Sequence, residues 1–209
     1  MPFISGLTQL RSLSIVGMAK NTGKTECLNY VLRRLWEEYP QVSLALTSIG
    51  IDGERRDQVT QTDKPEICLH PGTLFVTAEK FYRNKMVAAE VVGIDEQYTT
   101  SLGRAIYARS KGTGKVLIAG PASTGGLKHI IRKMRDRNID LTIIDGALSR
   151  ISLAAPSVSE GMILATGAAY SVQPEELIRK THHLYRLIQL PEYPLRAIAC
   201  RCRERDICD

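Results

Sequence analysis

Residues 12–25 read Ser-Leu-Ser-Ile-Val-Gly-Met-Ala-Lys-Asn-Thr-Gly-Lys-Thr, and this stretch decides the expected fold. Its apolar part, Leu13–Val16, has the length and composition of a short buried strand. After the loop, apolar side chains recur at helical spacing over residues 26–38. A strand, a loop ending in Gly-Lys-Thr and a helix, in this order, are the context that a phosphate-binding loop requires. The stretch therefore predicts a site for a nucleotide.

Such a loop binds phosphates through its backbone N–H groups and through the partial positive charge of the helix N-terminus. Lys24 would reach the β- and γ-phosphates, and the Thr25 hydroxyl would coordinate Mg²⁺. Lys20 also lies inside the loop, as in variant loops that place a second lysine at the phosphates. The residues that we expect to bind the nucleotide are Gly17, Lys20, Asn21, Thr22, Gly23, Lys24, Thr25 and Glu26.

The loop departs from the pattern G-x-x-x-x-G-K-[ST] at its first glycine. Met18 occupies that position, and Gly17 lies one residue earlier. We expect a turn that is one residue longer, with Gly17 in the tight conformation. The alternative is an ordinary strand, turn and helix with a chance Gly-Lys-Thr. A look-alike at Gly112–Lys115 precedes an apolar run instead of following one, so it predicts a turn into a strand.

Apolar runs and helical stretches alternate along the whole chain of 209 residues. This alternation predicts an α/β protein with the three-layer fold of P-loop NTPases, in which helices flank both faces of a mainly parallel sheet. We expect one nucleotide-binding domain over residues 1–194 and a tail or final short strand over residues 195–209.

The predicted strands are Leu13–Val16, Val42–Ile49, Thr73–Val76, Val91–Ile94, Val116–Ala119, Leu141–Ile144 and Gly161–Ala165, with His183–Leu190 as a further strand if it is not helical. The predicted helices are Lys24–Glu38, Ala78–Asn84, Thr99–Ser110, Gly126–Arg137 and one that begins near Pro174.

Open α/β sheets bind ligands at the carboxyl ends of their strands. Besides the Gly-Lys-Thr loop, three polar or glycine-rich loops follow predicted strands, at Gly50–Asp57, Gly120–Gly126 and Asp145–Ala147. We expect these loops to converge on one edge of the sheet.

Two aspartates are candidates for the metal. Asp145 ends an apolar strand, where an acidic residue holds Mg²⁺ directly or through water beside Thr25. A turn aspartate before Gly146 is the alternative for Asp145. Asp52 follows the second strand, where switch segments occur, and a solvated loop is the alternative. We therefore expect Lys24, Asp145 and Asp52 to be the catalytic groups, with Thr25, Asp145 and Asp52 at the metal.

The composition restricts the partners. The net charge is +6 without a long basic run, which suits a polyanionic nucleotide and does not require nucleic acid. The first ten residues do not resemble a signal peptide, and no apolar run approaches the ~20 residues of a membrane span. Five cysteines, an odd number, indicate reduced thiols and a cytoplasmic protein. Cys200, Cys202 and Cys208 have no assigned role.

Four segments together resemble a known group of proteins: Gly17–Thr25, Thr47–Gly53, Ile118–Pro121 and Ile144–Ala147. The group consists of the small P-loop proteins described as reactivase subunits of cobalamin-dependent lysine 5,6-aminomutase. It lies within the dethiobiotin-synthetase-like branch of P-loop proteins. The resemblance implies nucleotide binding and hydrolysis that help to exchange damaged cobalamin on the mutase, together with a larger partner similar to the MutS ATPase. Because many related nucleotide switches are dimers that share a site, a homodimer is an alternative to a monomer.

Three hypotheses follow. The first is a slow Mg²⁺-dependent NTPase that acts as a switch on a partner enzyme, and we favour it. The second is an ATP-dependent ligase or kinase that uses Lys64 and the Gly120–Gly126 loop for a small substrate. The third is a degenerate loop, with Met18 as its mark, which binds a partner and no nucleotide. An Asn-Lys-x-Asp motif for reading guanine is absent from the sequence, which favours ATP over GTP.

Overall fold

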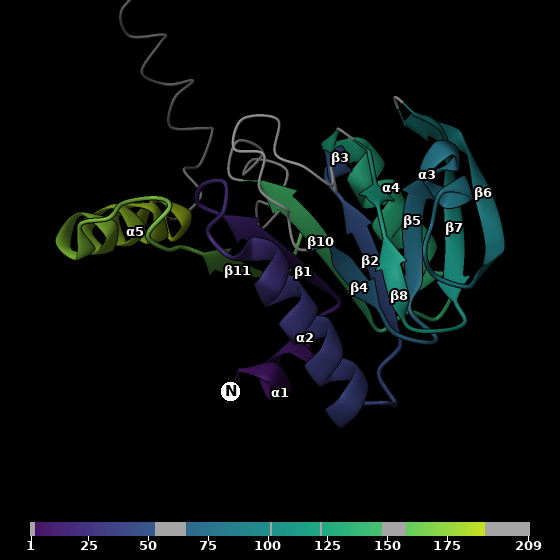
Figure 1. Ribbon diagram of the computed structural model, residues 1–209, viewed down its shortest axis with the longest axis horizontal. Coiled ribbons are helices and arrows are strands. Elements are labelled where there is room, and N and C mark those ends of the chain that lie inside the picture. Colours follow the sequence, from purple (N-terminus) through teal and green to yellow (C-terminus); the bar gives the residue numbers. More distant parts are fainter. Residues whose placement is uncertain (1–2, 53–65, 101, 122, 148–157, 191–209) are drawn as a thin grey trace, which may run out of the picture. The chain divides into compact units, whose positions relative to one another are not determined.

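The computed structural model describes residues 3–52, 66–100, 102–121, 123–147 and 158–190. The chain divides into two compact units, Met1–Tyr170 and Ser171–Asp209, which are described separately. In chain order the elements are α1 (Ile4–Leu7), β1 (Ser12–Gly17), α2 (Lys24–Glu38), β2 (Leu44–Ser48), β3 (Ile51–Asp52), β4 (Ile67–Leu69), β5 (Leu74–Ala78), α3 (Glu79–Arg83), β6 (Ala89–Thr100), β7 (Gly103–Ser110), β8 (Gly114–Val116), β9 (Ile118–Ala119), α4 (Thr124–Arg135), β10 (Leu141–Ala147), β11 (Gly161–Ala165) and α5 (Pro174–Ile188) (Figure 1).

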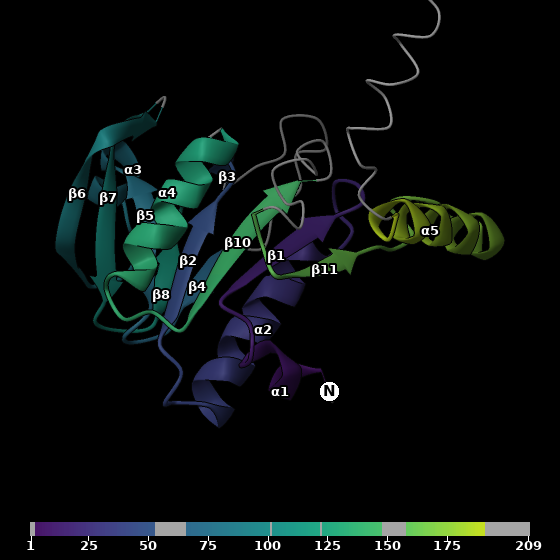
Figure 2. The same ribbon diagram turned by 180° about the vertical axis from the view of Figure 1, so that it is seen from behind.

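The first unit is built on a seven-stranded sheet with the strand order β11-β1-β10-β2-β5-β7-β6. The strands from β11 to β5 pair in parallel, whereas β7 runs antiparallel to β5, and β6 antiparallel to β7. Helices lie on both faces of this sheet, as the two opposite views show (Figures 1 and 2). The α/β class and the mostly parallel sheet that the sequence predicts are confirmed.

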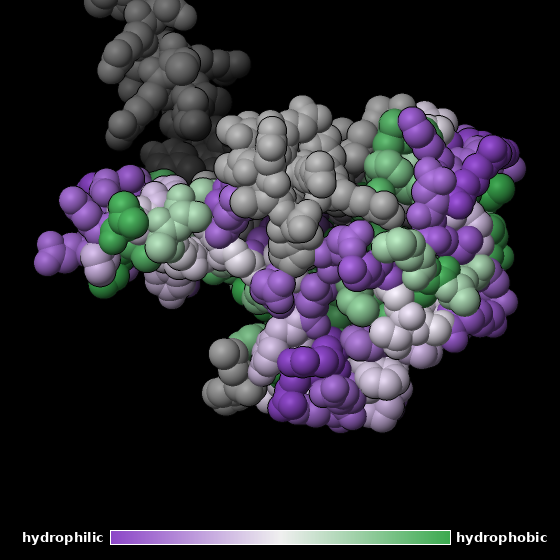
Figure 3. Space-filling model, in the orientation of Figure 1, coloured by the Kyte–Doolittle hydropathy of each residue, from purple (hydrophilic) through white to green (hydrophobic). Residues whose placement is uncertain are grey.

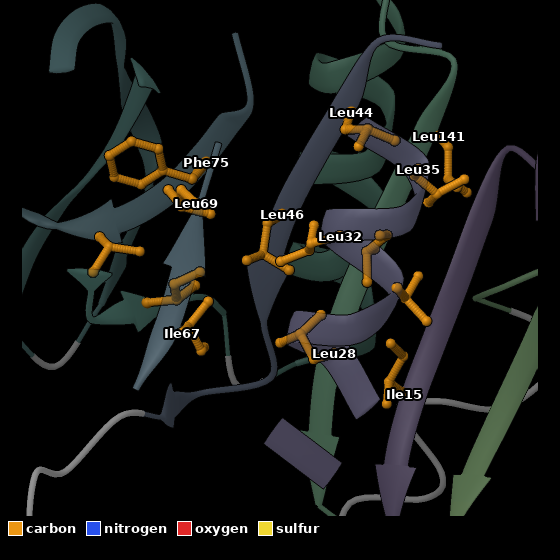
Figure 4. Packing of buried hydrophobic residues seen from close by; sticks show 14 of the residues in the cluster. Ile15, Leu28, Leu32, Leu35, Leu44, Leu46, Ile67, Leu69, Phe75 and Leu141 are labelled. Atoms are coloured by element: carbon orange, nitrogen blue, oxygen red, sulfur yellow. The ribbon is translucent and has the colours of Figure 1, made fainter. Parts of the chain in front are cut away.

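Helix α2 covers one face of the sheet. Its buried side chains are Leu28, Val31, Leu32 and Leu35, spaced three or four residues apart as a single apolar stripe requires. They pack against side chains that point to this face from β1, β2 and β10 (Figure 4). The helix occupies Lys24–Glu38, the range that the sequence predicts. Local periodicity was sufficient here because the stripe lies within one continuous segment.

A two-stranded antiparallel sheet of β4 and β8 contributes to the same hydrophobic core as α2. Ile67 and Leu69 of β4 pack in the cluster that also contains Leu28 and Phe75 (Figure 4). The Asn29 side chain joins α2 to β4, because its Nδ2 donates to Glu66 O at 3.0 Å and its Oδ1 accepts from Cys68 N at 3.0 Å. The amide thus pairs with β4 as a neighbouring strand would.

Helix α4 covers the opposite face, as the view from behind shows (Figure 2). Ser123 caps its N-terminus, with Oγ accepting from Gly126 N at 3.1 Å. Its buried apolar side chains are Leu127, Ile130, Ile131 and Met134, which pack on β1, β2, β5, β7 and β10. The sequence predicts this helix at Gly126–Arg137, and the structure begins it two residues earlier.

The helix predicted over Thr99–Ser110 is wrong, because the chain forms the end of β6 and the whole of β7 there. In β7, Ile106 and Ala108 face the core on the α2 side, and Ala105 and Tyr107 face α4. A strand buried on both faces has no alternation of apolar and polar residues, so periodicity does not distinguish it from a buried helix.

The strand predicted over Val116–Ala119 is not part of the seven-stranded sheet. It is divided between β8, which pairs with β4, and β9, which pairs with β3. Thr77 of β5 donates to the carbonyl of Leu117, between the two short strands, at 2.7 Å. The apolar character of this stretch therefore reflects burial against the sheet and not membership in it.

Strand β6 lies at one edge of the sheet, and apolar side chains reach the surface there (Figure 3). Val91, Val92 and Ile94 are each more than 40% exposed. The register with β7 shifts between Val91 and Gly93 and again between Ile94 and Thr99. Such irregularities weaken the pairing of an edge strand with another chain.

In the second unit, α5 begins at Pro174 with Glu175 and Glu176 in its first turn, as the sequence predicts. The alternative of a strand over His183–Leu190 is wrong, because the helix continues to Ile188. None of the helices in the described part of the chain combines the length and the apolar character needed to cross a lipid bilayer.

Candidate functional site

The loop between β1 and α2, Gly17–Lys24, folds back tightly over its first residue. A Cβ atom on Gly17 would lie 2.9 Å from Thr22 Oγ1 and 3.3 Å from Lys24 Cβ, which leaves no room for a side chain. Thr22 is buried, and its hydroxyl donates to Ala19 O at 2.9 Å across the loop. A glycine is therefore required at position 17, because Thr22 and Lys24 approach its backbone too closely for a side chain.

The left-handed residues of the loop are Asn21, with φ 60°, and Gly23, with φ 83°. Gly17 does not have a positive φ, so the expectation that it takes the tight conformation is wrong. Asparagine tolerates this region better than other side chains, and glycine adopts it without cost. The turn is thus made late in the loop, next to the start of α2.

Met18 replaces the first glycine of the motif for a visible reason. Its backbone N–H donates to Ala165 O at 2.9 Å, which continues the pairing of β1 with β11 by one residue before the chain turns. Its side chain is buried, with 2% exposure, and its φ is not positive. A methionine is therefore compatible with this position.

The two helices that begin near this edge differ at their N-termini. In α2 the N-cap is Gly23, which has no side chain to accept a hydrogen bond from the first turn. In α4 the hydroxyl of Ser123 fills that role. The N-terminus of α2, with the positive end of the helix dipole and with Thr25 and Glu26 in its first turn, therefore lacks the side-chain cap that α4 has.

Lys24 and Asp145 form an ion pair at the start of α2. Lys24 Nζ lies 2.6 Å from Asp145 Oδ1, and the side chains are 15% and 1% exposed. The pair joins residues 121 positions apart in sequence. It forms because β1 and β10 are neighbouring parallel strands, with Ile15 opposite Asp145. The structure thus brings together the two residues that the sequence analysis placed at the phosphates and at the metal.

The end of β2 and the segment after β9 meet at the same edge. Ser48 lies opposite Asp145 in register, and Ile49 N donates to Asp145 O at 2.9 Å. Gly120 N donates to Gly50 O at 2.8 Å, and Gly50 N donates to Pro121 O at 3.1 Å. The loop after β1, the ends of β2 and β10 and the segment at Gly120 therefore meet at one edge, although that segment does not follow a strand of the main sheet. The predicted loop Asp145–Ala147 is part of β10, which continues to Ala147.

The structure describes only some of the other residues that the sequence predicts for the site. Lys20 lies on the exposed side of the loop, and Thr25 is partly buried. Asp52 is in β3, whose backbone pairs it with Ile118, and the structure does not describe its side chain. Lys64, Cys200, Cys202 and Cys208 lie outside the described residues. Among the described residues, no cluster of three or more His, Cys, Asp or Glu side chains could hold a metal ion.

The look-alike segment Gly112–Lys115 and the thiol of Cys27 lie apart from this site. The look-alike leads into β8, which begins at Gly114, as predicted, and Lys115 pairs with Glu66 at 2.7 Å. Cys27 packs partly buried against the core around α2, and burial raises the pKa of its thiol. Neither group belongs to the edge where Lys24 and Asp145 meet.

A second polar cluster, which the sequence analysis did not identify, surrounds Asp95 between β6, β7 and α4. The buried carboxylate accepts from Tyr107 Oη at 2.6 Å, contacts His129 Nε2 at 2.9 Å and accepts from the N–H groups of Gln97 and Tyr98. Burial by itself would raise the pKa of Asp95, but these hydrogen bonds outweigh it and hold the pKa below its usual value. Burial, together with the Asp95 carboxylate, raises the pKa of the Tyr107 hydroxyl. The cluster thus connects α4 to the part of β6 where the register with β7 shifts, between Ile94 and Thr99.

This cluster predicts a pH-dependent contribution to stability. We expect Asp95→Asn to lower the free energy of unfolding by about 2 kcal/mol at neutral pH, because hydrogen bonds to a charged group are lost. A depressed folded-state pKa means that the carboxylate stabilises the fold above the unfolded pKa of about 4 and loses this effect as the pH falls through the folded value. Urea unfolding between about pH 7 and pH 3 measures the difference between the two proteins.

The difference should shrink toward the acid end of that range. Asp136→Asn, at an exposed aspartate after α4, is the control and should change stability by less than about 0.5 kcal/mol. A difference between the wild type and Asp95→Asn that stays constant down to pH 3 would exclude the proposed electrostatic origin.

Comparison of the chain with protein-family models, with curated proteins and with solved structures found no match in any of the three. The function must therefore be argued from the site itself.

Proposed function

We propose that the chain binds a nucleoside triphosphate with Mg²⁺ at the Gly17–Lys24 loop and acts as a nucleotide-driven switch of the P-loop type. The ion pair between Lys24 and Asp145, at the uncapped start of α2, is the observation that carries this proposal. It puts a cation beside helix N–H groups and a carboxylate next to them, which suits a polyphosphate and its metal ion.

The residues present fit both groups. Lys24 lies at the start of α2, whose N-cap, Gly23, has no side chain to cap the helix. Thr25 and Asp145 would hold Mg²⁺, and Asp52 stays a predicted third group. Bound Mg²⁺ supplies charge stabilisation at the β- and γ-oxygens.

In this proposal, Lys24 and Asp145 change their partners when the nucleotide binds. Lys24 leaves Asp145 for the phosphate oxygens, and the carboxylate becomes available to the metal. The N–H groups of the loop and of the first turn of α2 donate to the phosphates. The resemblance described above suggests a narrower function, in which hydrolysis drives the reactivation of a cobalamin-dependent aminomutase together with a MutS-like subunit.

Thermal unfolding with Mg·ATP, Mg·GTP or no nucleotide tests the binding. A ligand at about 100 times its dissociation constant adds about 2.7 kcal/mol of stability. For a chain of this size that corresponds to a rise in Tm of roughly 5–10 °C. We expect this rise in the wild type and its loss in Lys24→Ala, with each variant compared to its own ligand-free Tm.

Lys115→Ala, in the look-alike segment, is the matched control and should keep the full rise in Tm. A rise that survives in Lys24→Ala would reject the proposed site. If nucleotide binds, hydrolysis assays decide the mode of action: acceleration by a protein partner supports the switch, and acceleration by a small metabolite supports the ligase or kinase alternative.

A further inference from the structure

Ser48 ends β2 beside the candidate site. In the parallel pairing of β2 with β10, it lies directly opposite Asp145. Side chains alternate between the two faces of a strand, so Ser48 shares the face of Leu44 and Leu46. Those two leucines pack in the cluster formed with α2, as Figure 4 shows. Ser48 is therefore on the same side of the sheet as Lys24, in the strand next to Asp145.

The hydroxyl of Ser48 is buried and has no partner in the part of the chain that the structure describes. The residue has 0% exposure, and its Oγ has no hydrogen-bond partner among the described residues. Buried hydroxyl groups in folded proteins are paired in the large majority of cases, because leaving one unpaired is unfavourable. An unpaired hydroxyl next to a candidate metal-binding carboxylate indicates that its partner arrives with the ligand.

Thr47 provides an internal comparison. Its hydroxyl is equally buried and also unpaired among the described residues. Thr47 lies opposite Ile144, on the face that packs against α4. Gly120 covers it, since a Cβ on that glycine would lie 2.9 Å from Thr47 Oγ1. The two neighbouring hydroxyls thus share burial and lack of a partner, and only Ser48 is on the side of Lys24 and Asp145.

We propose that Ser48 is a positioning residue for the metal ion of the bound nucleotide, with its hydroxyl hydrogen-bonded to a water molecule of the Mg²⁺ hydration shell. This inference rests on the proposed function. In this role, Ser48 would orient the hydrated metal ion from β2, the strand next to Asp145. Neither the loop motif nor the two aspartates supply such a contact.

A titration with Mg²⁺ at saturating ATP, followed by thermal unfolding, tests the role. The proteins are the wild type, Ser48→Ala and Thr47→Val, each also measured without ligand and with ATP in the presence of EDTA. In the ligand-free state we expect the Tm of Ser48→Ala to equal or exceed that of the wild type, because an unpaired polar group is removed. With ATP and EDTA the rise in Tm should match the wild type.

The wild type and Ser48→Ala should differ in how their Tm depends on the concentration of Mg²⁺. We expect Ser48→Ala to need about 3- to 10-fold more Mg²⁺ for half of the metal-dependent rise in Tm, the loss expected for one hydrogen bond. Thr47→Val should need the same Mg²⁺ concentration as the wild type. This readout is a metal affinity, which a purely structural role of Ser48 would not change.

The outcomes separate the two levels of inference. If ATP gives no rise in the wild type, the proposed function itself fails. If the wild type responds and Ser48→Ala needs the same Mg²⁺ concentration, the role of Ser48 is rejected and the site stands. An equal loss in Thr47→Val, or a lowered ligand-free Tm of Ser48→Ala, would also reject it, since both indicate packing and not metal positioning.

Discussion

Gly120→Ala is expected to lower the free energy of unfolding by about 3–5 kcal/mol, a large part of the total stability of a typical domain. A Cβ on Gly120 would lie 1.8 Å from the carbonyl oxygen of Ser48. That oxygen belongs to the backbone of β2 and has no rotamer with which to move away. The clash can be relieved only if the segment around Gly120 moves away from β2. This movement breaks the hydrogen bonds that Gly50 makes with Gly120 and Pro121. Urea unfolding followed by circular dichroism measures the loss.

Gly125→Ala is the matched control, five residues further along the same segment. Among the described residues outside the helix's own backbone, a Cβ at this position would approach Tyr98 Oη alone, at 3.9 Å, and the residue is already helical. We expect an unchanged stability or a gain of up to about 1 kcal/mol, because alanine loses less conformational entropy than glycine in a helix. Equal stabilities of Gly120→Ala and Gly125→Ala would contradict the close packing of this segment on β2.

Lys24→Ala is expected to lower the free energy of unfolding of the ligand-free protein by about 3 kcal/mol. The substitution leaves the Asp145 carboxylate, which is 1% exposed, without the ammonium group that lies 2.6 Å away. We expect the lower end of the range for buried ion pairs because the Lys24 side chain is itself 15% exposed. Equilibrium urea unfolding without nucleotide measures this change.

A double-mutant cycle separates the ion pair from other effects of the substitution. In the Lys24→Ala background, Asp145→Asn should restore about half of the lost stability, since it removes the buried charge. Lys128→Ala, at an exposed lysine of α4, should change stability by less than about 0.5 kcal/mol. Additive effects of Lys24→Ala and Asp145→Asn would show that the ion pair does not stabilise the fold.

The ion pair also links stability to the proposed function. In the ligand-free protein, Lys24 stabilises a carboxylate that the proposed mechanism needs for the metal. Binding of a nucleotide must therefore compensate for separating Lys24 from Asp145. The affinity of the site is then the difference between the new phosphate contacts and the lost ion pair, which is why each variant must be compared with its own ligand-free state.

Part of the candidate site could be predicted because its signals are local. The apolar run of β1, the loop that ends in Gly23 and Lys24, and the stripe of α2 lie in one continuous segment, and α2 has the predicted bounds. Asp145 was found by the same reasoning, since it follows an apolar run. The details of the loop were not predictable, because the conformation of Gly17 depends on how the chain folds back over it.

Other parts of the fold were missed because their signals are long-range. Strand β7 is buried on both faces by residues from β4, α4 and the neighbouring strands, so its sequence carries no alternation. The four donors around Asp95 come from β6, β7 and α4. Ser48 is an ordinary residue in the sequence, and only a polar pair at the end of an apolar run, Thr47-Ser48, could have drawn attention to it.

By itself, the sequence determined the α/β class, the segment from β1 through α2 and the position of Asp145 near the end of a strand, because each follows from the spacing of residues within a few turns or one strand. The strand itself continues past Asp145 to Ala147. The tertiary structure alone decided that Lys24 meets Asp145, that Ser48 is buried in the strand next to that carboxylate without a partner among the described residues, and that Gly120 must lack a side chain. Those facts depend on which strands are neighbours and in which register. Pairing between distant segments sets both, and no local pattern of apolar residues encodes it.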